Sequence, residues 1–217
     1  MILSKLPVRH SVFHEFKTSS GGERLFFNKG VLGVALSDPD EDTTVCMFNA
    51  HLQSDFWRES RETREEQAKE MKTFVQKSIH SRVFVGSSSS DVIDAAVVCG
   101  DLNCIAGSAE YEKIMEVLGG EKQTFRDTLP IGDDDDESLQ TFPECTYSLK
   151  KRRYVVVDET TKKKRLDYIF EISEEGEVKM SRRRKTKARV VRALRDDNNV
   201  PLSDHRGIIA AIERVYT

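Results

Sequence analysis

Four short segments of this 217-residue chain place histidine, aspartate or asparagine beside apolar runs, where such side chains can act on a bound group. The first segment is Asn49-Ala50-His51-Leu52-Gln53, at the end of an apolar, β-rich run. A histidine there can donate a hydrogen bond to a phosphate oxygen and stabilise charge that develops in a transition state. A lone histidine in such a place is more often structural, so His51 alone does not identify a site.

The second segment, Gly100-Asp101-Leu102-Asn103, directly follows the apolar run Val92–Cys99. Its glycine permits close approach of the backbone or an unusual dihedral angle. Asp101 can accept a hydrogen bond from water or bind a hard cation through oxygen, and Asn103 can orient a nucleophile or a phosphate. The same residue types also favour a simple turn. The segment by itself leaves both interpretations open.

The third and fourth segments carry Asp167 and His205. Asp167 lies within the apolar run 165–170, where a carboxylate without a partner is costly. A histidine is a natural partner, because a carboxylate fixes the imidazole tautomer and supports its protonated form. In Ser203-Asp204-His205 an irregular loop lets Asp204 reach a metal while His205 acts as a general base. Alone, Ser-Asp-His also fits an ordinary loop.

The apolar pattern predicts the elements that must position these residues. Short β-rich runs alternate with segments of helical periodicity, which predicts a single α/β domain over 1–217, with a sheet core covered by helices. The expected strands are Val31–Leu36, Thr44–Leu52, Val92–Cys99, Tyr154–Val157, Leu166–Ile172 and Gly207–Tyr216, and the expected helices are Arg58–His80 and Ala109–Leu118.

The helix 58–80 is the best defined of these elements. Its apolar residues, among them Ala68 and Met71, recur at helical spacing and predict one buried stripe. Gln67, Glu70 and Lys77 are expected to face water. Acidic loops such as 133–137 and the serine-rich segment 86–91 are expected to connect elements without a chemical role.

Composition and charge limit the class of protein. Hydrophobic residues make up 38% of the chain, which is enough to exclude disorder throughout. No apolar run approaches the ~20 residues that a membrane-spanning helix needs. The four cysteines form no CxxC pair, so we expect free thiols, a reducing compartment and a cytoplasmic location. The cysteines do not cluster with histidines either, so we expect no zinc site.

Charge is distributed unevenly along the chain. Residues 150–195 hold 17 of the 34 Lys and Arg residues against 7 acidic ones, although the net charge of the chain is −3. A block of this kind is usually a solvated hairpin or a flexible connection, and contact with an anionic surface or a nucleic acid is the alternative.

Taken together and in this order, Gly-Asp-x-Asn, an apolar strand with a central Asp and Ser-Asp-His resemble the endonuclease/exonuclease/phosphatase superfamily over residues 1–217. Four short sequence segments are similar to segments of neutral sphingomyelinases within that superfamily. These segments are Asn28-Lys29-Gly30-Val31, His51-Leu52-Gln53, Arg64-Glu65-Glu66-Gln67 and Pro201-Leu202-Ser203-Asp204-His205. The resemblance implies a DNase I-like fold of the α/β (α+β) class, a β-sandwich of two mixed sheets covered by helices.

The resemblance also implies catalytic roles. His205 is expected to be the general base that activates water for in-line attack, and Asp167 is expected to orient it. Asp101 and Asn103 are expected to position the nucleophile and the phosphate or metal. His51 is expected to stabilise the pentacovalent transition state.

The expected cofactor is Mg²⁺, with Mn²⁺ as an alternative. The resemblance implies Asp101, Asp204 and His205 as residues at or near the metal. It places Asn28 and Lys29 near the entrance for the substrate.

The chain departs from the family pattern at its beginning. The family's metal-binding glutamate and a substrate-side asparagine lie on the first strands of the domain, whereas Met1–Val8 resembles the strand that follows them. Glu15 and Glu23 come too late and lack an apolar strand context. An N-terminally truncated domain, a non-catalytic paralogue and complementation by another chain are the three explanations, and the activity of the chain itself stays open.

The leading functional hypothesis is hydrolysis of sphingomyelin at a membrane surface, which releases ceramide and phosphocholine. Phe56-Trp57 can supply an apolar surface loop beside the site, or can pack in the core. A nuclease or phosphoinositide phosphatase of the same superfamily is the nearest alternative, since clustered Lys and Arg suit phosphate backbones. A binding module without catalysis is the alternative from another class.

Overall fold

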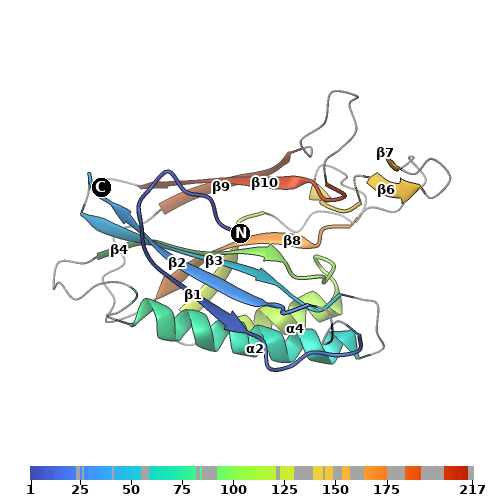
Figure 1. Ribbon diagram of the computed structural model, residues 1–217. Helices are drawn as coiled ribbons and strands as arrows, with labels where there is room; N and C mark the ends of the chain where they lie inside the picture. Colours follow the sequence, from blue (N-terminus) through green and yellow to red (C-terminus); the bar gives the residue numbers. More distant parts are fainter. Residues whose placement is uncertain are drawn as a thin grey trace.

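A computed structural model describes residues 1–22, 25, 27–40, 42–54, 59–81, 84, 92–120, 123–129, 139–143, 145–148, 153–156, 164–174, 184–191 and 203–214. A six-stranded sheet lies at the centre of the molecule (Figure 1). Its strands, in spatial order, are β1 (Val8–Glu15), β2 (Gly30–Asp38), β3 (Thr43–His51), β4 (Val92–Asp101), β8 (Asp167–Glu174) and β5 (Gln123–Asp127).

The sheet is mixed, because one pair of neighbours is parallel. β3 and β4 run parallel, and the other neighbouring pairs are antiparallel. Parallel neighbours cannot be joined by a tight turn. The connection from β3 to β4 accordingly contains the helix α2 (Ser60–Ile79), which crosses one face of the sheet.

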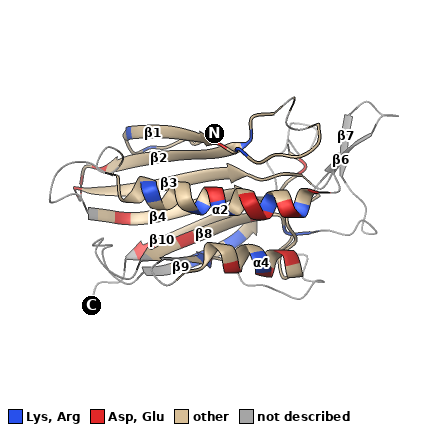
Figure 2. Ribbon diagram, turned by 90° about the horizontal axis from the view of Figure 1, so that it is seen from below, with Lys and Arg blue, Asp and Glu red and all other residues tan. Residues whose placement is uncertain are grey.

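Both described helices cover the same face of the sheet. α4 (Ala109–Leu118) lies beside α2, and the Ser108 hydroxyl caps its start by accepting a hydrogen bond from the Tyr111 N–H at 3.1 Å (Figure 1). Apolar side chains of α2, such as Met71 and Val75, pack with Phe48 and Val98 of the sheet in one buried core. The outer side of the helices carries both acidic and basic residues (Figure 2).

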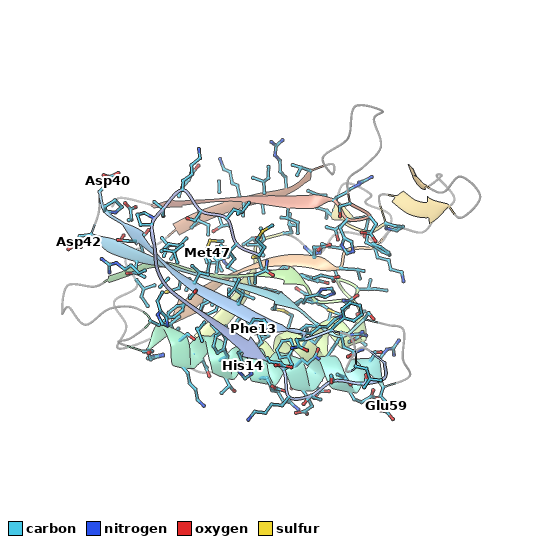
Figure 3. The ribbon with its side chains drawn as sticks, viewed as in Figure 1. Phe13, His14, Asp40, Asp42, Met47 and Glu59 are labelled. Carbon is cyan, nitrogen blue, oxygen red and sulfur yellow. The ribbon has the colours of Figure 1, made fainter. Side chains whose placement is uncertain are left out.

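The opposite face of the sheet is covered by a second, smaller layer. β9 (Arg184–Val191) and β10 (Gly207–Arg214) form an antiparallel pair there (Figure 1). Met47 of β3 points toward this layer (Figure 3), and a largely apolar cavity of about 730 Å³ lies between the layers. Another antiparallel pair is formed by β6 (Cys145–Ser148) and β7 (Arg153–Val156). The expected sandwich of sheets with helical cover is confirmed.

The expected elements occur close to their predicted bounds, with one wrong expectation at the start. Met1–Val8 was expected to be a strand, but β1 begins at Val8.

None of the helices in the described part of the chain is long and apolar enough to cross a membrane. Cys46, Cys99 and Cys104 are free thiols, as expected. Segments 86–91 and 133–137 and the pair Phe56-Trp57 lie outside the described residues.

The expectation that Gln67 and Glu70 face water is wrong. The Glu70 side chain is only 18% exposed, and its carboxylate accepts hydrogen bonds from the N–H groups of Lys17 and Thr18. Gln67 is fully buried, its Oε1 accepts a hydrogen bond from the Gln53 N–H at 2.8 Å, and its Nε2 donates to the Thr18 carbonyl at 2.8 Å. A buried amide is tolerated when its donors and acceptors have partners. These partners come from loops far away in the sequence, which helical periodicity does not reveal.

Candidate active site

Three polar residues at strand ends form one row across the central sheet. His51 is the last residue of β3, Asp101 is the last residue of β4, and Asp167 is the first residue of β8. His51 is directly opposite Asp101, and Asp101 is directly opposite Asp167. Opposed residues on neighbouring strands lie about 5 Å apart. The strand register therefore brings an imidazole and two carboxylates to one edge of the sheet.

The row lies on the face that β10 covers. Side chains two positions apart in a strand share a face. Asn49 and Cys99, two positions before His51 and Asp101, line the cavity between the sheet and β10. The row consequently faces away from the helices and toward the segment that precedes β10.

That preceding segment brings His205 to the row. The His205 Nδ1 lies 2.7 Å from Asp167 Oδ2, and its Nε2 lies 4.0 Å from Asp101 Oδ2. An Nδ1–H that donates to a carboxylate leaves Nε2 as the nitrogen that can accept a proton. The Nε2 of His51 lies 3.6 Å from the same Asp101 oxygen. The two histidines thus approach Asp101 from opposite sides.

Thr141 fixes the position of Asp167 relative to His205, and sequence analysis did not single this residue out. The buried Thr141 Oγ1 accepts hydrogen bonds from the N–H groups of Leu166 at 3.0 Å and Asp167 at 3.2 Å. Its carbonyl accepts from the Arg206 N–H at 2.7 Å. One residue thus holds both the start of β8 and the residue after His205. It belongs to no apolar or helical pattern that would have singled it out.

The Gly-Asp-x-Asn segment adopts a backbone that requires its glycine. Gly100 has φ of +142°, and a Cβ there would lie 1.8 Å from the Ala50 carbonyl oxygen. Asn103 has φ of +51°, and its N–H donates to Asp101 Oδ1 at 2.7 Å. The local turn therefore places Asp101 with one oxygen held by the backbone and the other directed at the histidines.

Asn103 and Lys29 meet at one carbonyl beside His51. The Leu52 oxygen accepts a hydrogen bond from Asn103 Nδ2 at 3.0 Å and from Lys29 Nζ at 2.7 Å. Lys29 and Asn28 also line a cavity of about 450 Å³ together with His51. The structure therefore brings all the sequence-predicted site residues near one edge of the sheet, with Asn28 and Lys29 at its margin.

Gln53 and Arg64, which belong to two of the family-like segments, make structural contacts and do not lie in the site. Arg64 and Gln53 are fully buried. Arg64 Nη1 donates to the Gln53 carbonyl at 2.9 Å, and Arg64 Nε donates to Glu110 Oε1 at 2.6 Å. Gln53 and Gln67 are joined as described above. These contacts tie α2 and α4 to the loop that follows His51 and so support the position of that histidine.

The electrostatics of the row follow from its burial. Burial, together with the facing charge of Asp167, raises the pKa of Asp101 to about 6, although the Asn103 N–H and His205 favour its charged form. Burial by itself lowers the pKa of His205. The hydrogen bond with Asp167 and the charges of Asp167, Asp101 and Asp204 outweigh burial, so the pKa of His205 lies above its ordinary value.

The expected metal set is not assembled. Asp101, Asp204 and His205 were expected at the metal, but the described residues contain no group of three or more His, Cys, Asp or Glu side chains that could hold a metal ion. His205 turns toward Asp167 and Asp101, while Asp204 acts on His205 through its charge. The carboxylates of Asp101 and Asp167 supply the oxygen ligands that suit Mg²⁺, but they form an incomplete shell.

Comparison with known proteins gives matches at the level of structure. No protein-family model and no curated protein sequence matches the chain. SmcL superposes with a TM-score of 0.65 at 21% identity, over 97% of this chain and 67% of SmcL. Sphingomyelinase C from Streptomyces griseocarneus has a TM-score of 0.62 at 17% identity, over 98% of this chain and 66% of that one.

TDP2 and beta toxin are two further similar structures. Truncated TDP2 from Caenorhabditis elegans superposes with a TM-score of 0.58 at 18% identity, over 98% of this chain and 69% of TDP2. Beta toxin from Staphylococcus aureus, in a form with bound magnesium ions, has a TM-score of 0.59 at 20% identity over 98% of this chain and 66% of the toxin. This chain spans about two thirds of the length of each of these proteins. It has the fold of the endonuclease/exonuclease/phosphatase superfamily, and it is similar in structure to sphingomyelinases and to TDP2.

Proposed function

We propose that this chain forms the catalytic part of a metal-dependent phosphodiesterase that hydrolyses sphingomyelin to ceramide and phosphocholine. The observation that carries the proposal is the His205–Asp167 hydrogen bond of 2.7 Å directly beside Asp101 and His51. An oriented histidine next to a second histidine is suited to remove a proton from water and to stabilise the anion that results at phosphorus.

The reaction follows from the positions of these groups. His205 Nε2 takes a proton from water, and the water oxygen forms a bond to phosphorus. The bond between phosphorus and the ceramide oxygen breaks, and that oxygen takes up a proton from solvent water, so phosphocholine and ceramide are released. The imidazolium of His205 returns its proton to solvent before the next turnover. Asp167 holds the imidazolium of His205 by charge, and His51 donates to a phosphate oxygen.

A divalent cation fits part of this arrangement. Mg²⁺ usually binds through one or two carboxylates and keeps several waters. Asp101 and Asp167 supply two carboxylates, and the mutual repulsion that raises the pKa of Asp101 would be relieved by a cation. When bound, the cation supplies positive charge to the phosphate oxygens. The bound magnesium ions in beta toxin support Mg²⁺ as the choice.

Sphingomyelin is preferred as substrate because sphingomyelinase C is among the structures similar to this chain. The second candidate is a phosphodiester in nucleic acid. A structure of TDP2 from D. rerio with a single-stranded DNA product is also similar, with a TM-score of 0.57 at 14% identity. The exposed side chains of Lys187 and Arg189 on β9 are an observation in favour of that candidate.

The test is release of phosphocholine from sphingomyelin vesicles by the purified chain with Mg²⁺. We expect release that EDTA abolishes and that His205→Asn lowers at least about a hundredfold. His80→Asn is the matched control, because His80 is an exposed histidine at the end of α2. A chain whose phosphocholine release equals that of His205→Asn would contradict the proposal. Faster cleavage of single-stranded DNA than of sphingomyelin would favour the second candidate.

A further inference from the structure

Large apolar side chains are exposed beside the candidate site. Phe13 is 51% exposed and Phe27 63%, and both line the cavity that contains His51. Single exposed apolar residues are normal, but a group of them beside a binding pocket indicates an interaction surface. We call these two residues the apolar rim.

The rim is continuous with the pocket that contains His51. Phe13 is directly opposite Leu32, and Leu32 is directly opposite Asn49, two positions before His51. Phe13 therefore shares the face of the sheet on which the row of site residues lies. Phe13, Phe27 and Leu32 line the same cavity of about 450 Å³ as His51. The cavity therefore has both apolar and polar lining residues.

The backbone at Gly30 makes room for the rim. A Cβ on Gly30 would lie 2.6 Å from Phe13 Cζ, so the ring occupies the space that a side chain at position 30 would fill. Gly30 is the first residue of β2 and directly follows Lys29. The Phe13 ring thereby lies close to the lysine at the margin of the site.

Two lysines and one glutamate flank the rim. Phe27 lines a second cavity, of about 380 Å³, together with Lys17, Lys29 and Glu15, so the charged side chains there carry a net positive charge. Lysine keeps its ammonium group at the level of phosphates while its stem lies along apolar surface. Phenylalanine and leucine next to lysine are the composition of surfaces that insert shallowly into a lipid layer.

We infer that the apolar rim inserts into the hydrocarbon edge of a phospholipid layer, with Lys17 and Lys29 at the level of its phosphates, and that the cavity presents a lipid phosphodiester to His51. This inference rests on the proposed function, because it names how the same site reaches its substrate. Nucleobases also stack on phenylalanine. The aliphatic Leu32, which lines the same cavity, favours hydrocarbon, since it offers no ring for stacking.

The test compares binding of the chain to sedimented vesicles of sphingomyelin and phosphatidylcholine. We expect Phe13→Ala/Phe27→Ala to weaken vesicle binding by about tenfold or more, because two large apolar side chains no longer leave water. Val8→Ala is the matched control, because Val8 is 58% exposed and lies at the other end of β1. Circular dichroism at rising temperature verifies that each variant is folded.

A conservative variant separates hydrocarbon contact from base stacking. Phe13→Leu/Phe27→Leu keeps apolar area and removes the rings. We expect it to bind vesicles within about threefold of the original chain, since a leucine buries nearly as much apolar surface as a phenylalanine. Loss of vesicle binding in the leucine variant, with parallel loss of binding to a single-stranded oligonucleotide, would assign the rim to nucleic acid and overturn the inference.

Failure of the inference and failure of the proposed function would give different results in the vesicle-binding and phosphocholine-release experiments. If the chain and the alanine variant bind vesicles equally, the inference is wrong, whatever the enzymatic activity. If vesicle binding depends on Phe13 and Phe27 but no phosphocholine is released, the surface stands and the proposed reaction is wrong. With an active chain, we expect the alanine variant to lose more activity on vesicles than on bis(p-nitrophenyl) phosphate.

Discussion

The Nδ1 of His205 lies 2.7 Å from the Oδ2 of Asp167, a contact between residues that are 38 positions apart in the sequence. The carboxylate fixes which nitrogen of the imidazole carries the proton and which faces Asp101. The pair can therefore be tested without a substrate, by the titration of the histidine.

Asp167→Asn is expected to lower the pKa of His205. The charged partner raises that pKa above the ordinary value of about 6.5, so its removal moves the titration to lower pH. NMR titration of His205 without a divalent cation measures the shift. With an active chain, kcat should fall about a hundredfold or more, because the base is no longer oriented. An unchanged titration curve would show that the carboxylate does not control this histidine.

Thr141→Val is expected to destabilise the chain by about 1–3 kcal/mol. Valine keeps the shape of threonine but leaves the N–H groups of Leu166 and Asp167 without their acceptor. Urea unfolding measures the loss. Thr141→Ser keeps Oγ and is the control, with an expected loss smaller than that of valine. The His205 titration in Thr141→Val adds a readout of positioning, since a displaced Asp167 should also lower that pKa. Equal stability of both variants would argue against the hydrogen bonds.

Gly100→Ala is expected to destabilise the chain by about 3 kcal/mol or more. The added methyl group meets the Ala50 carbonyl on the neighbouring strand, and the φ of +142° is unfavourable for alanine. Gly107→Ala, at a φ of +74°, should cost only about 1–2 kcal/mol. Thermal unfolding of both variants gives the comparison. Similar losses at the two positions would contradict the close approach of β3 and β4 at Gly100.

Glu70 is expected to stabilise the fold in a pH-dependent way. Burial by itself raises its pKa, but hydrogen bonds from the N–H groups of Lys17 at 2.9 Å and Thr18 at 3.0 Å outweigh burial and lower the pKa. A lowered folded-state pKa means that the contribution is present above the unfolded value of about 4.3 and is lost as pH falls through the folded value.

Glu70→Gln removes this pH dependence. The difference in unfolding free energy between the original chain and the variant should be present at pH 5 and shrink as the pH falls below about 4.3. Glu62→Gln is the control, because Glu62 is an exposed glutamate of the same helix. A difference that grows as the pH falls below about 4.3 would have the wrong sign for the proposed hydrogen bonds.

The sequence by itself determined the residue types of the site and most of the central sheet. Apolar runs ended at His51 and Asp101, and the segments around Asp167 and His205 adjoined further runs. Because strand ends are where side chains leave the core, local patterns marked these residues as candidates, and their order along the chain, with the family resemblance it carries, singled them out together. The helix α4 has the predicted bounds, since its apolar spacing and its Ser108 cap are both local signals.

Only the tertiary structure decided how these residues meet and what supports them. The row of His51, Asp101 and Asp167 depends on strand register, and Thr141 acts through backbone contacts that no local period encodes. Gln67 is polar yet buried, because its partners are distant loops. Periodicity reports which side of an element is apolar. Pairing across many positions is set by the free energy of the whole packed chain.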